Sequence, residues 1–383
     1  MDTLIPLDLG TLRVIWWVLL GALLIGFAIM DGFDLGVAAL LPFVAKNDAE
    51  RRIAINVVGP VWEGNQVWLI TAGGAIFAAW PLLYAAAFSG FYLAMLLLLL
   101  ALILRPVAFK YRSKMASPRW RNNWDYVLCG SGLVASLVFG VAMGNVILGV
   151  PHDFHAVTLR STWSGHFFQL FTPFAVLAGL ISVFMLLMHG AVLLAWRTED
   201  PVAGRARRLG QIAALLTALL FVAAGFWVAR LDGYVITNAI HPDGPANPMI
   251  KEVIAAPGAW LHNFTKWPLF WIAPAMGVAG ALLTIVLLAL RVNVLSFLTS
   301  SLTLTGIILT VGFALFPFIM PSALNPKAGL TIWDASSSRL TLWVMLIAVA
   351  VFLPLVTLYT AWVYRVMRGK VTQESISDTP NSY

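Results

Sequence analysis

Three acidic residues interrupt long apolar stretches of this sequence, and they are the side chains best suited to chemistry. Asp31 and Asp34 stand three positions apart, which places both on one face of a helix. Glu63 lies in a second apolar stretch and is followed closely by Asn65 and Gln66, whose amides donate and accept hydrogen bonds. A carboxylate at mid-bilayer costs at least about 2.5–3.5 kcal/mol on insertion scales, so each acid marks a candidate functional site. The chemistry that such groups offer inside a membrane is proton transfer.

The spacing of these acids from the nearest basic residues predicts that they share one depth. At a rise of 1.5 Å per residue, Asp34 lies roughly 18 Å and Asp31 roughly 22 Å above Lys46. Counted from Arg51 along the returning helix, Glu63 also lies roughly 18 Å up. Adjacent antiparallel helices would therefore carry three acids at one level, close enough for water to link them.

Two interpretations of this cluster remain open at this stage. The acids form a proton relay, or they belong to an ion pair or hydrogen-bonded core that only orients the helices. Arg105, near the inner end of the next apolar stretch, is an available counter-ion for the second interpretation. If the relay exists, Glu63→Gln and Asp31→Asn are expected to assemble normally but to slow proton-coupled turnover.

The composition defines the elements that must position these residues. Of the 383 residues, 60% are hydrophobic and 11% are charged, whereas about 25% of a soluble domain is charged. Apolar runs of about 20 residues recur along the chain, so it is an all-α polytopic membrane protein rather than a soluble, disordered or disulfide-rich one. The single cysteine, Cys129, excludes an intrachain disulfide and zinc or iron–sulfur sites built from several cysteines.

Nine membrane spans are predicted from the apolar runs and the breaks between them. Their approximate ranges are 12–43, 51–79, 82–109, 120–148, 163–196, 205–231, 257–290, 294–320 and 335–367. The second is the least obvious, because Glu63, Asn65 and Gln66 lower its hydropathy and a window scan could miss it. The first run is expected to be a retained span rather than a signal peptide, since no small-residue cleavage site follows it.

The distribution of basic residues favours nine spans, a periplasmic N-terminus and a cytoplasmic C-terminus. This arrangement places 17 of the 24 Lys and Arg residues in cytoplasmic segments and seven outside. The net charge of +7 is thereby explained by orientation in the bilayer, without nucleic acid as a partner. Residues 1–370 form a single transmembrane domain, and 371–383 form a short polar cytoplasmic tail. The longest outer connection, about 232–256, is interpreted either as a connector or as a lid or docking surface.

The histidines and tryptophans give weaker indications of a cofactor. A membrane haem needs an axial His or Met, and His189 is the one histidine well inside a predicted span. Because no second intramembrane histidine matches its depth, a packing or gating role is the alternative interpretation. Trp62 and Trp68 flank the polar cluster, where packing competes with contact to a cofactor or quinone. No nucleotide, zinc or nucleophile motif is evident, so no catalytic centre or metal site is expected in this chain alone.

Several long blocks identify a family that the sequence resembles over nearly its whole length. It resembles subunit II of the bacterial cytochrome bd quinol oxidase, and the blocks are polar where composition alone predicts apolar residues. They are Ile15-Trp16-Trp17, Asp31-Gly32-Phe33-Asp34, Trp62-Glu63-Gly64-Asn65-Gln66-Val67-Trp68 with the following residues to Ala75, Tyr84 to Tyr92, Arg105-Pro106, Arg119-Trp120-Arg121-Asn122, Phe316-Pro317-Phe318 and Trp333-Asp334-Ala335-Ser336-Ser337.

The resemblance implies a role within a complex of the bacterial inner membrane. In this family subunit I holds two b-type haems, one d-type haem and the quinol site, and subunit II is its similarly folded partner. The complex oxidises quinol and reduces O2 to water with protons from the cytoplasm. Acids of subunit II are implicated in the proton path, matching Asp31 or Asp34 and Glu63, although some members carry Asp at the position of Glu63. A structural quinone and small accessory subunits occur in some relatives.

Two alternatives from other functional classes remain. A proton-coupled secondary transporter would also need buried acids, but the sequence shows no clear repeat pair of broken helices. A purely structural partner would carry the same acids without using them. If a partner subunit is present, the first three helices are the surface expected to meet it.

Overall fold

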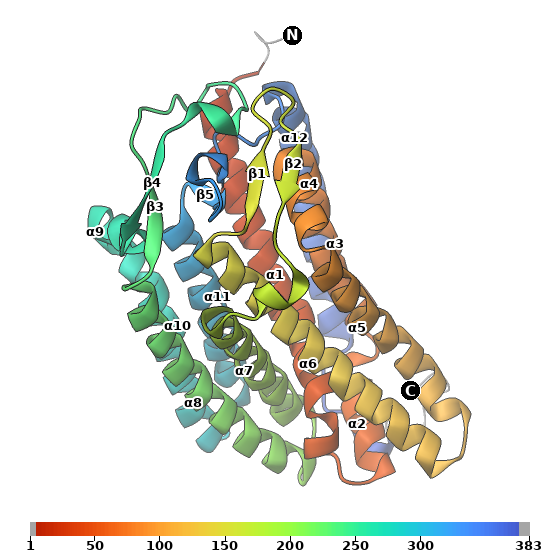
Figure 1. Ribbon diagram of the computed structural model, residues 1–383. Helices are drawn as coiled ribbons and strands as arrows, with labels where there is room; N and C mark the ends of the chain where they lie inside the picture. The colour runs from red at the N-terminus through yellow and green to blue at the C-terminus, as the bar shows by residue number, and fades with distance from the viewer. Residues whose placement is uncertain (1–4, 375–383) are drawn as a thin grey trace.

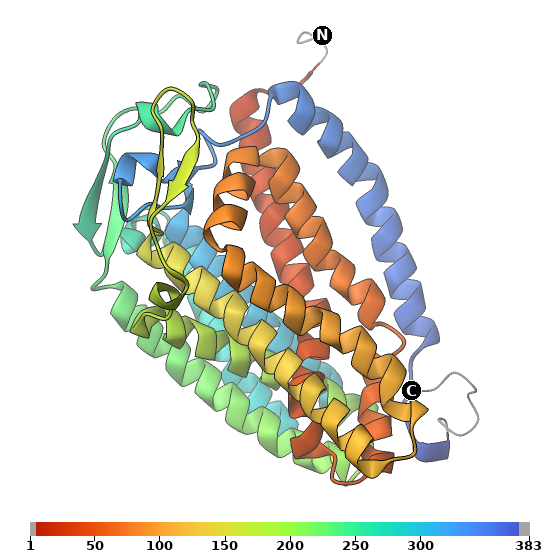
Figure 2. The same cartoon turned by 45° about the vertical axis from the view of Figure 1, so that its right-hand side comes forward.

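The chain folds into a bundle of long helices, with small hairpins gathered at one end (Figures 1 and 2). The computed structural model describes residues 5–374. Within that range eight helical segments are long and apolar enough to cross a membrane. They are Leu9–Val44, Tyr92–Lys114, Pro118–Leu148, Pro173–Arg197, Val202–Val228, Pro268–Ala289, Asn293–Leu315 and Arg339–Val366. These segments contain α1, α5, α6, α7, α8, α10, α11 and α12, in that order.

Eight of the nine ranges predicted from the sequence overlap these segments, and the second range matches none of them. The stretch 51–79 is divided into α2 (Asp48–Val58) and α3 (Trp62–Ala79), with a turn between them. Helix α3 is not among the eight apolar segments, because its first turns carry polar residues. It nevertheless packs along α1 within the bundle. The third range is also divided, into α4 (Pro81–Gly90) and α5 (Tyr92–Tyr111).

Two predicted spans begin later than the sequence suggested. Helix α7 (Pro173–Arg197) starts ten residues after position 163, because Thr172 caps it and Pro173 occupies its first position. Helix α10 (Ile272–Ala289) is preceded by short helical turns, including α9 (His262–Lys266), rather than by a continuous span from 257. Apolar composition alone did not distinguish the short turns that precede α7 and α10 from the helices themselves.

Three two-stranded antiparallel hairpins lie between the helices and were not expected in an all-α protein. They pair β1 (His152–Phe154) with β2 (Ser161–Trp163), β3 (Asp232–Ile236) with β4 (Val253–Pro257), and β5 (Phe318–Met320) with β6 (Leu330–Thr331). All three gather toward the end of the bundle where α1 begins, at the top of Figure 1. The long connection near 232–256 thus begins and ends in paired strands.

Helix α1 (Leu9–Val44) is central, and it contacts α3, α6 (Pro118–Leu148), α7 and α11 (Asn293–Leu315). It approaches α7 closely, because Gly36 and Gly190 face each other so tightly that a Cβ atom on either would overlap the other helix's backbone. Helix α8 (Val202–Val228) packs against α7 and α10, and α10 packs in turn against α11.

Helix α12 (Arg339–Val366) lies at the edge of the bundle, as Figure 2 shows, and Leu342 is its one buried residue. The helix therefore leaves most of its surface uncovered by this chain. Of the predicted polar tail 371–383, residues 375–383 lie outside the described part of the chain.

Candidate functional site

A fully buried ion pair joins α1 to α5 inside the bundle. The guanidinium of Arg105 donates to both carboxylate oxygens of Asp31, with Nη1–Oδ1 at 2.8 Å and Nη2–Oδ2 at 3.2 Å. Neither side chain is exposed to solvent. This two-point geometry is the strongest that an arginine and a carboxylate can form, so the charge of Asp31 is closely compensated.

The second acid on the same face of α1 has a different environment. Asp34 Oδ2 accepts a hydrogen bond of 2.8 Å from Nδ2 of Asn65, near the start of α3. Asn65 Oδ1 in turn accepts a hydrogen bond of 2.8 Å from the hydroxyl of Tyr364 on α12. Three helices thus meet in one hydrogen-bonded chain that ends on a buried carboxyl group.

Asp34 is the less compensated of the two buried acids. Its Oδ1 atom has no hydrogen-bond partner among residues 5–374, and the Nε atom of Arg105 is likewise unpartnered there. An ionised carboxylate in an apolar interior is costly without a cation of its own, whereas a protonated one is not. Asp34 can therefore hold a proton on Oδ1, the oxygen that has no hydrogen-bond partner among the described residues.

Glu63 differs from the sequence-based expectation that three acids share one shielded cluster. Its side chain is exposed, and it makes no hydrogen bond or ion pair within the described residues. The cause is helical phase, since residues two positions apart do not share a face. Asn65 points inward to Asp34, so Glu63 points outward from the same turn. Gln66 is half-buried on this turn.

His189 lies fully buried against α1 and α11, and its ring is held on both sides. Nδ1 is 2.8 Å from Ser300 Oγ, and Nε2 is 3.0 Å from the backbone oxygen of Ile29. Phe33 and Phe297 pack against the ring. Because both nitrogens are engaged, the geometry does not fit an axial haem ligand and favours the packing interpretation.

The two tryptophans beside the cluster are used in helix packing. Trp62 is buried and lies against Phe109, with ring centroids 5.5 Å apart. Trp68 lies over Gly26 of α1, at a place where a Cβ atom would overlap the indole ring. The glycine admits the ring, so α1 and α3 approach closely beside the acids.

A second buried polar cluster, at the end of the bundle that carries the hairpins, was not anticipated from the sequence. Lys251 Nζ is 2.8 Å from Asp334 Oδ2, and both side chains are almost fully buried. Arg13 of α1 donates to Ser336 Oγ at 2.7 Å. These partners are separated by 83 or more positions, so no local pattern could reveal them.

His152 anchors the same end of the molecule. Its Nε2 atom lies 3.0 Å from the backbone oxygen of Ala328, and the residue is fully buried. Burial away from water lowers the pKa of His152 from 6.5 to about 4, because the charged imidazolium loses its hydration. The histidine is therefore a neutral structural element at physiological pH.

The fold and the buried cluster define a class, namely a polytopic helical membrane protein that keeps an ion-paired and a nearly uncompensated carboxyl group inside its bundle. The sequence profile of the cytochrome bd terminal oxidase subunit II family matches residues 12–367. The chain belongs to this family.

Full-length relatives agree with this assignment. The chain is 50% identical over 377 residues to cytochrome bd-I ubiquinol oxidase subunit 2 of Escherichia coli K12, covering 98% of this chain and 99% of the relative. It is 48% identical over 376 residues to a probable cytochrome oxidase subunit 2 of Haemophilus influenzae, with the same coverage. It is 31% identical to the Bacillus subtilis cytochrome bd ubiquinol oxidase subunit 2, covering 96% of this chain and 98% of the relative.

The fold is also that of a solved structure. A chain of the bd oxidase from Geobacillus thermodenitrificans superimposes with a TM-score of 0.70, covering 93% of this chain and 98% of that one, at 17% identity. At this identity the likeness concerns the fold alone.

Proposed function

We propose that this chain is subunit II of a bacterial cytochrome bd-type oxidase, which couples quinol oxidation to the reduction of O2 to water. The observation that carries the proposal is the 50% sequence identity to a ubiquinol oxidase subunit 2. The alignment covers 98% of this chain and 99% of that relative. A proton-coupled transporter is not favoured, because family membership accounts for the buried acids without one.

The direct test is to express the chain with and without a subunit I partner. Reduced-minus-oxidised spectra and oxygen uptake with quinol are then recorded for each membrane preparation. The proposal expects haem signals and quinol-dependent oxygen uptake only from the pair. Substrate flux through the chain alone, or an active oxidase without it, contradicts the proposal.

Within the complex, the chain's acids are proposed to form part of a cytoplasmic proton pathway. Asp34 supports this role because one carboxylate oxygen is unpartnered and the other is held by Asn65. Asp31, paired with Arg105, would fix the electrostatic field in which Asp34 takes up and releases its proton. In this proposal Asp34 holds the proton and Asp31 is its positioning neighbour.

Glu63 and Gln66 would complete the pathway at the surface of α3. An exposed carboxylate facing lipid is expensive, whereas one facing a partner subunit or bound water is not. The exposed face of α3 and α5 also carries large apolar side chains, among them Ile70 and Leu99. We therefore propose that subunit I covers this face, in line with the expectation that the first three helices meet the partner.

The proposed topology has nine spans, with the N-terminus periplasmic, the C-terminus cytoplasmic, and α2 and α3 as the second crossing. Its support is that α3 packs along α1 and that basic residues concentrate in the segments that this topology makes cytoplasmic. Residues 1–370 would act as one transmembrane domain of the bacterial inner membrane. A reporter fused between α5 and α6 tests this topology, since it should remain on the cytoplasmic side.

The haems of the complex are assigned to subunit I, namely two of b type and one of d type. The support from this chain is that its one intramembrane histidine, His189, already uses both ring nitrogens. When bound, those haems supply the electron transfer and the oxygen chemistry. This chain would contribute scaffold, interface and proton-bearing groups.

A further inference from the structure

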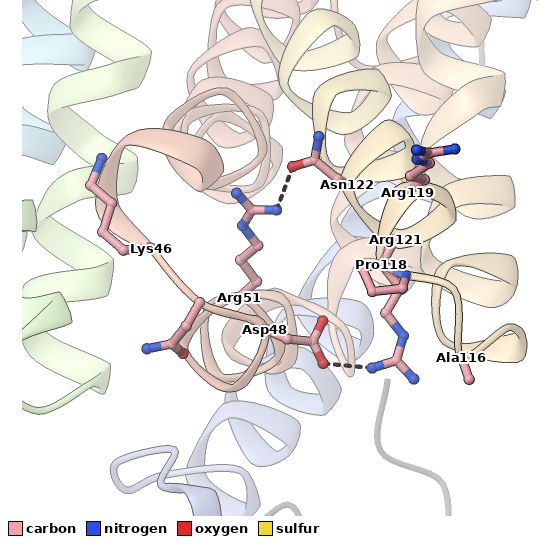
Figure 3. Close-up of a pocket in the computed structure, with 9 residues that line it drawn as sticks. Lys46, Asp48, Arg51, Ala116, Pro118, Arg119, Arg121 and Asn122 are labelled. Carbon is pink, nitrogen blue, oxygen red and sulfur yellow. Dashed lines mark hydrogen bonds and ion pairs between the residues drawn. The ribbon is translucent and has the colours of Figure 1, made fainter.

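A basic cavity of about 470 Å³ opens at the end of the bundle opposite the hairpins. It lies where α1 ends, α2 begins and α6 begins, as Figure 3 shows. Its lining residues are Lys46, Asn47, Asp48, Arg51, Ala116, Pro118, Arg119, Arg121 and Asn122. Four of them are cationic and one is acidic, so the lining carries a formal excess of positive charge.

Ion pairs, some buried and some partly exposed, surround this cavity. Arg51 donates to Asp125 at 2.8 Å and to Asn122 at 2.9 Å, and the Asp125 side chain is fully buried. Arg121 donates to Asp48 at 2.7 Å. Arg112 reaches behind both acids, at 2.5 Å from Asp125 and 2.8 Å from Asp48. The shape is therefore built by charged contacts between elements rather than by a loose loop.

Two of the lining cations, Lys46 and Arg119, do not take part in these ion pairs. The Nζ atom of Lys46 has one contact within the described residues, at 3.4 Å from the backbone oxygen of Pro42. Arg119 makes no ion pair or hydrogen bond with residues 5–374. In Figure 3 these side chains lie on opposite sides of Arg51. The cavity therefore has an unpaired cation at each side, with Arg51 between them.

One of two helix starts beside the cavity reinforces the preference for an anion. Helix α2 is capped by Asn47, and the 31-residue helix α6 is capped by Ser117, directly beside lining residues. The backbone N–H groups at helix starts carry partial positive charge and favour phosphate oxygens. The start of α6 has no acidic residue in its first turn and adds to the field of the two cations, whereas Asp48 and Glu50 offset the start of α2.

The surroundings of the cavity point to a lipid rather than a soluble anion. Spanning helices α1 and α5 end here and α6 begins here, so the cavity lies at the depth of the headgroups. The adjoining helix ends carry exposed aromatic side chains: Phe43 near the end of α1, Tyr111 at the end of α5 and Tyr126 near the start of α6 are each more than half exposed. Aromatic residues at the ends of spans are typical of the membrane–water interface.

We propose that this cavity binds the phosphate group of an anionic phospholipid, with Lys46 and Arg119 supplying positive charge from its two sides and the acyl chains lying along α1 and α6. Basic pockets between transmembrane helices recognise such headgroups through their charge. A bound lipid would join the α1–α2 connection to the start of α6.

The test uses the intact two-subunit complex, delipidated and reconstituted with phosphatidylglycerol or phosphatidylcholine vesicles. Native mass spectrometry then counts the lipid molecules retained. Lys46→Gln and Arg119→Gln should each weaken phosphatidylglycerol retention about fivefold, and together about 25-fold, because a basic side chain near an anionic lipid contributes about 1 kcal/mol. Neither side chain forms an ion pair within residues 5–374, so both variants should fold. The matched control is Lys114→Gln, an exposed cation of the same segment outside the cavity.

Three outcomes overturn the proposal. The double variant could retain phosphatidylglycerol as well as the Lys114→Gln control does. Phosphatidylcholine could be retained equally, which removes the role of net negative charge. Inorganic phosphate at millimolar concentration could displace phosphatidylglycerol from the complex and bind the lipid-free complex with the same dependence on Lys46 and Arg119, which identifies a soluble anion as the ligand.

Discussion

Substitutions in the buried ion pair between Arg105 and Asp31 test how much this pair contributes to the stability of the bundle. At 2.8 Å and an effective dielectric constant of about 20, the Coulomb attraction is about 6 kcal/mol, before the cost of removing both groups from water is subtracted. Removing one partner leaves a bare buried charge and typically costs about 3–5 kcal/mol. Arg105→Gln is therefore expected to destabilise the complex severely.

The double variant Arg105→Gln with Asp31→Asn separates this effect from simple loss of shape. Because it leaves two neutral amides in place of two charges, it should recover most of the lost stability. The assay is the fraction of assembled, haem-containing complex that survives a series of temperatures in detergent. Lys114→Gln is the surface control. The reasoning is refuted if the single variant is as stable as the control, or if the double variant is less stable than the single one.

Three further predictions concern individual residues. Glu63→Gln should leave haem content unchanged and slow quinol-dependent oxygen uptake at least about tenfold, and a wild-type rate would contradict the pathway role. His189→Leu should lower stability by about 1–3 kcal/mol, since Ser300 and the Ile29 carbonyl lose their partner, while difference spectra keep every haem; selective loss of one haem from a stable complex would contradict this. His152 has a pKa of about 4 in the folded chain against 6.5 unfolded, so the unfolded chain binds more protons between those values. The free energy of unfolding should therefore be independent of His152 above about pH 6.5 and should fall by about 3 kcal/mol as the pH drops toward 4. In thermal unfolding scans, His152→Gln should flatten this pH dependence.

The sequence was most informative about polar residues that are energetically unfavourable inside a membrane. Asp31 and Asp34 stood out because a bilayer penalises them, and both are buried on one face of α1. Arg105 was expected as an available counter-ion, and it contacts Asp31 in the structure. Asn65 was singled out beside Glu63, and it reaches Asp34. Spans were also predictable, because their apolar length is set by the bilayer.

The sequence was less informative about the direction in which side chains point. Depth along a helix follows from counting residues, but rotation about its axis depends on contacts that counting does not contain. Glu63 was therefore expected inside the cluster and lies on the exposed face of α3. Tyr364 was not anticipated at all, because its contact with Asn65 spans 299 positions.

The hairpins and the buried Lys251–Asp334 pair were missed for a related reason. Short strands between spans have no periodicity long enough to distinguish them from ordinary connections. Ion pairs between distant segments depend on the folded arrangement of the loops. A charged residue outside the spans gives no sign of its burial, since such residues are usually exposed.

Proton uptake by an Asp34→Asn variant tests the central claim most directly. The complex is reconstituted into liposomes, and uptake from the side carrying α2 and the start of α6 is followed with a pH dye during a single round of oxygen reduction. The account predicts a wild-type haem spectrum together with uptake slowed at least about tenfold, because the unpartnered oxygen of Asp34 can no longer hold the transferred proton. Uptake at the wild-type rate in a fully assembled variant would contradict it.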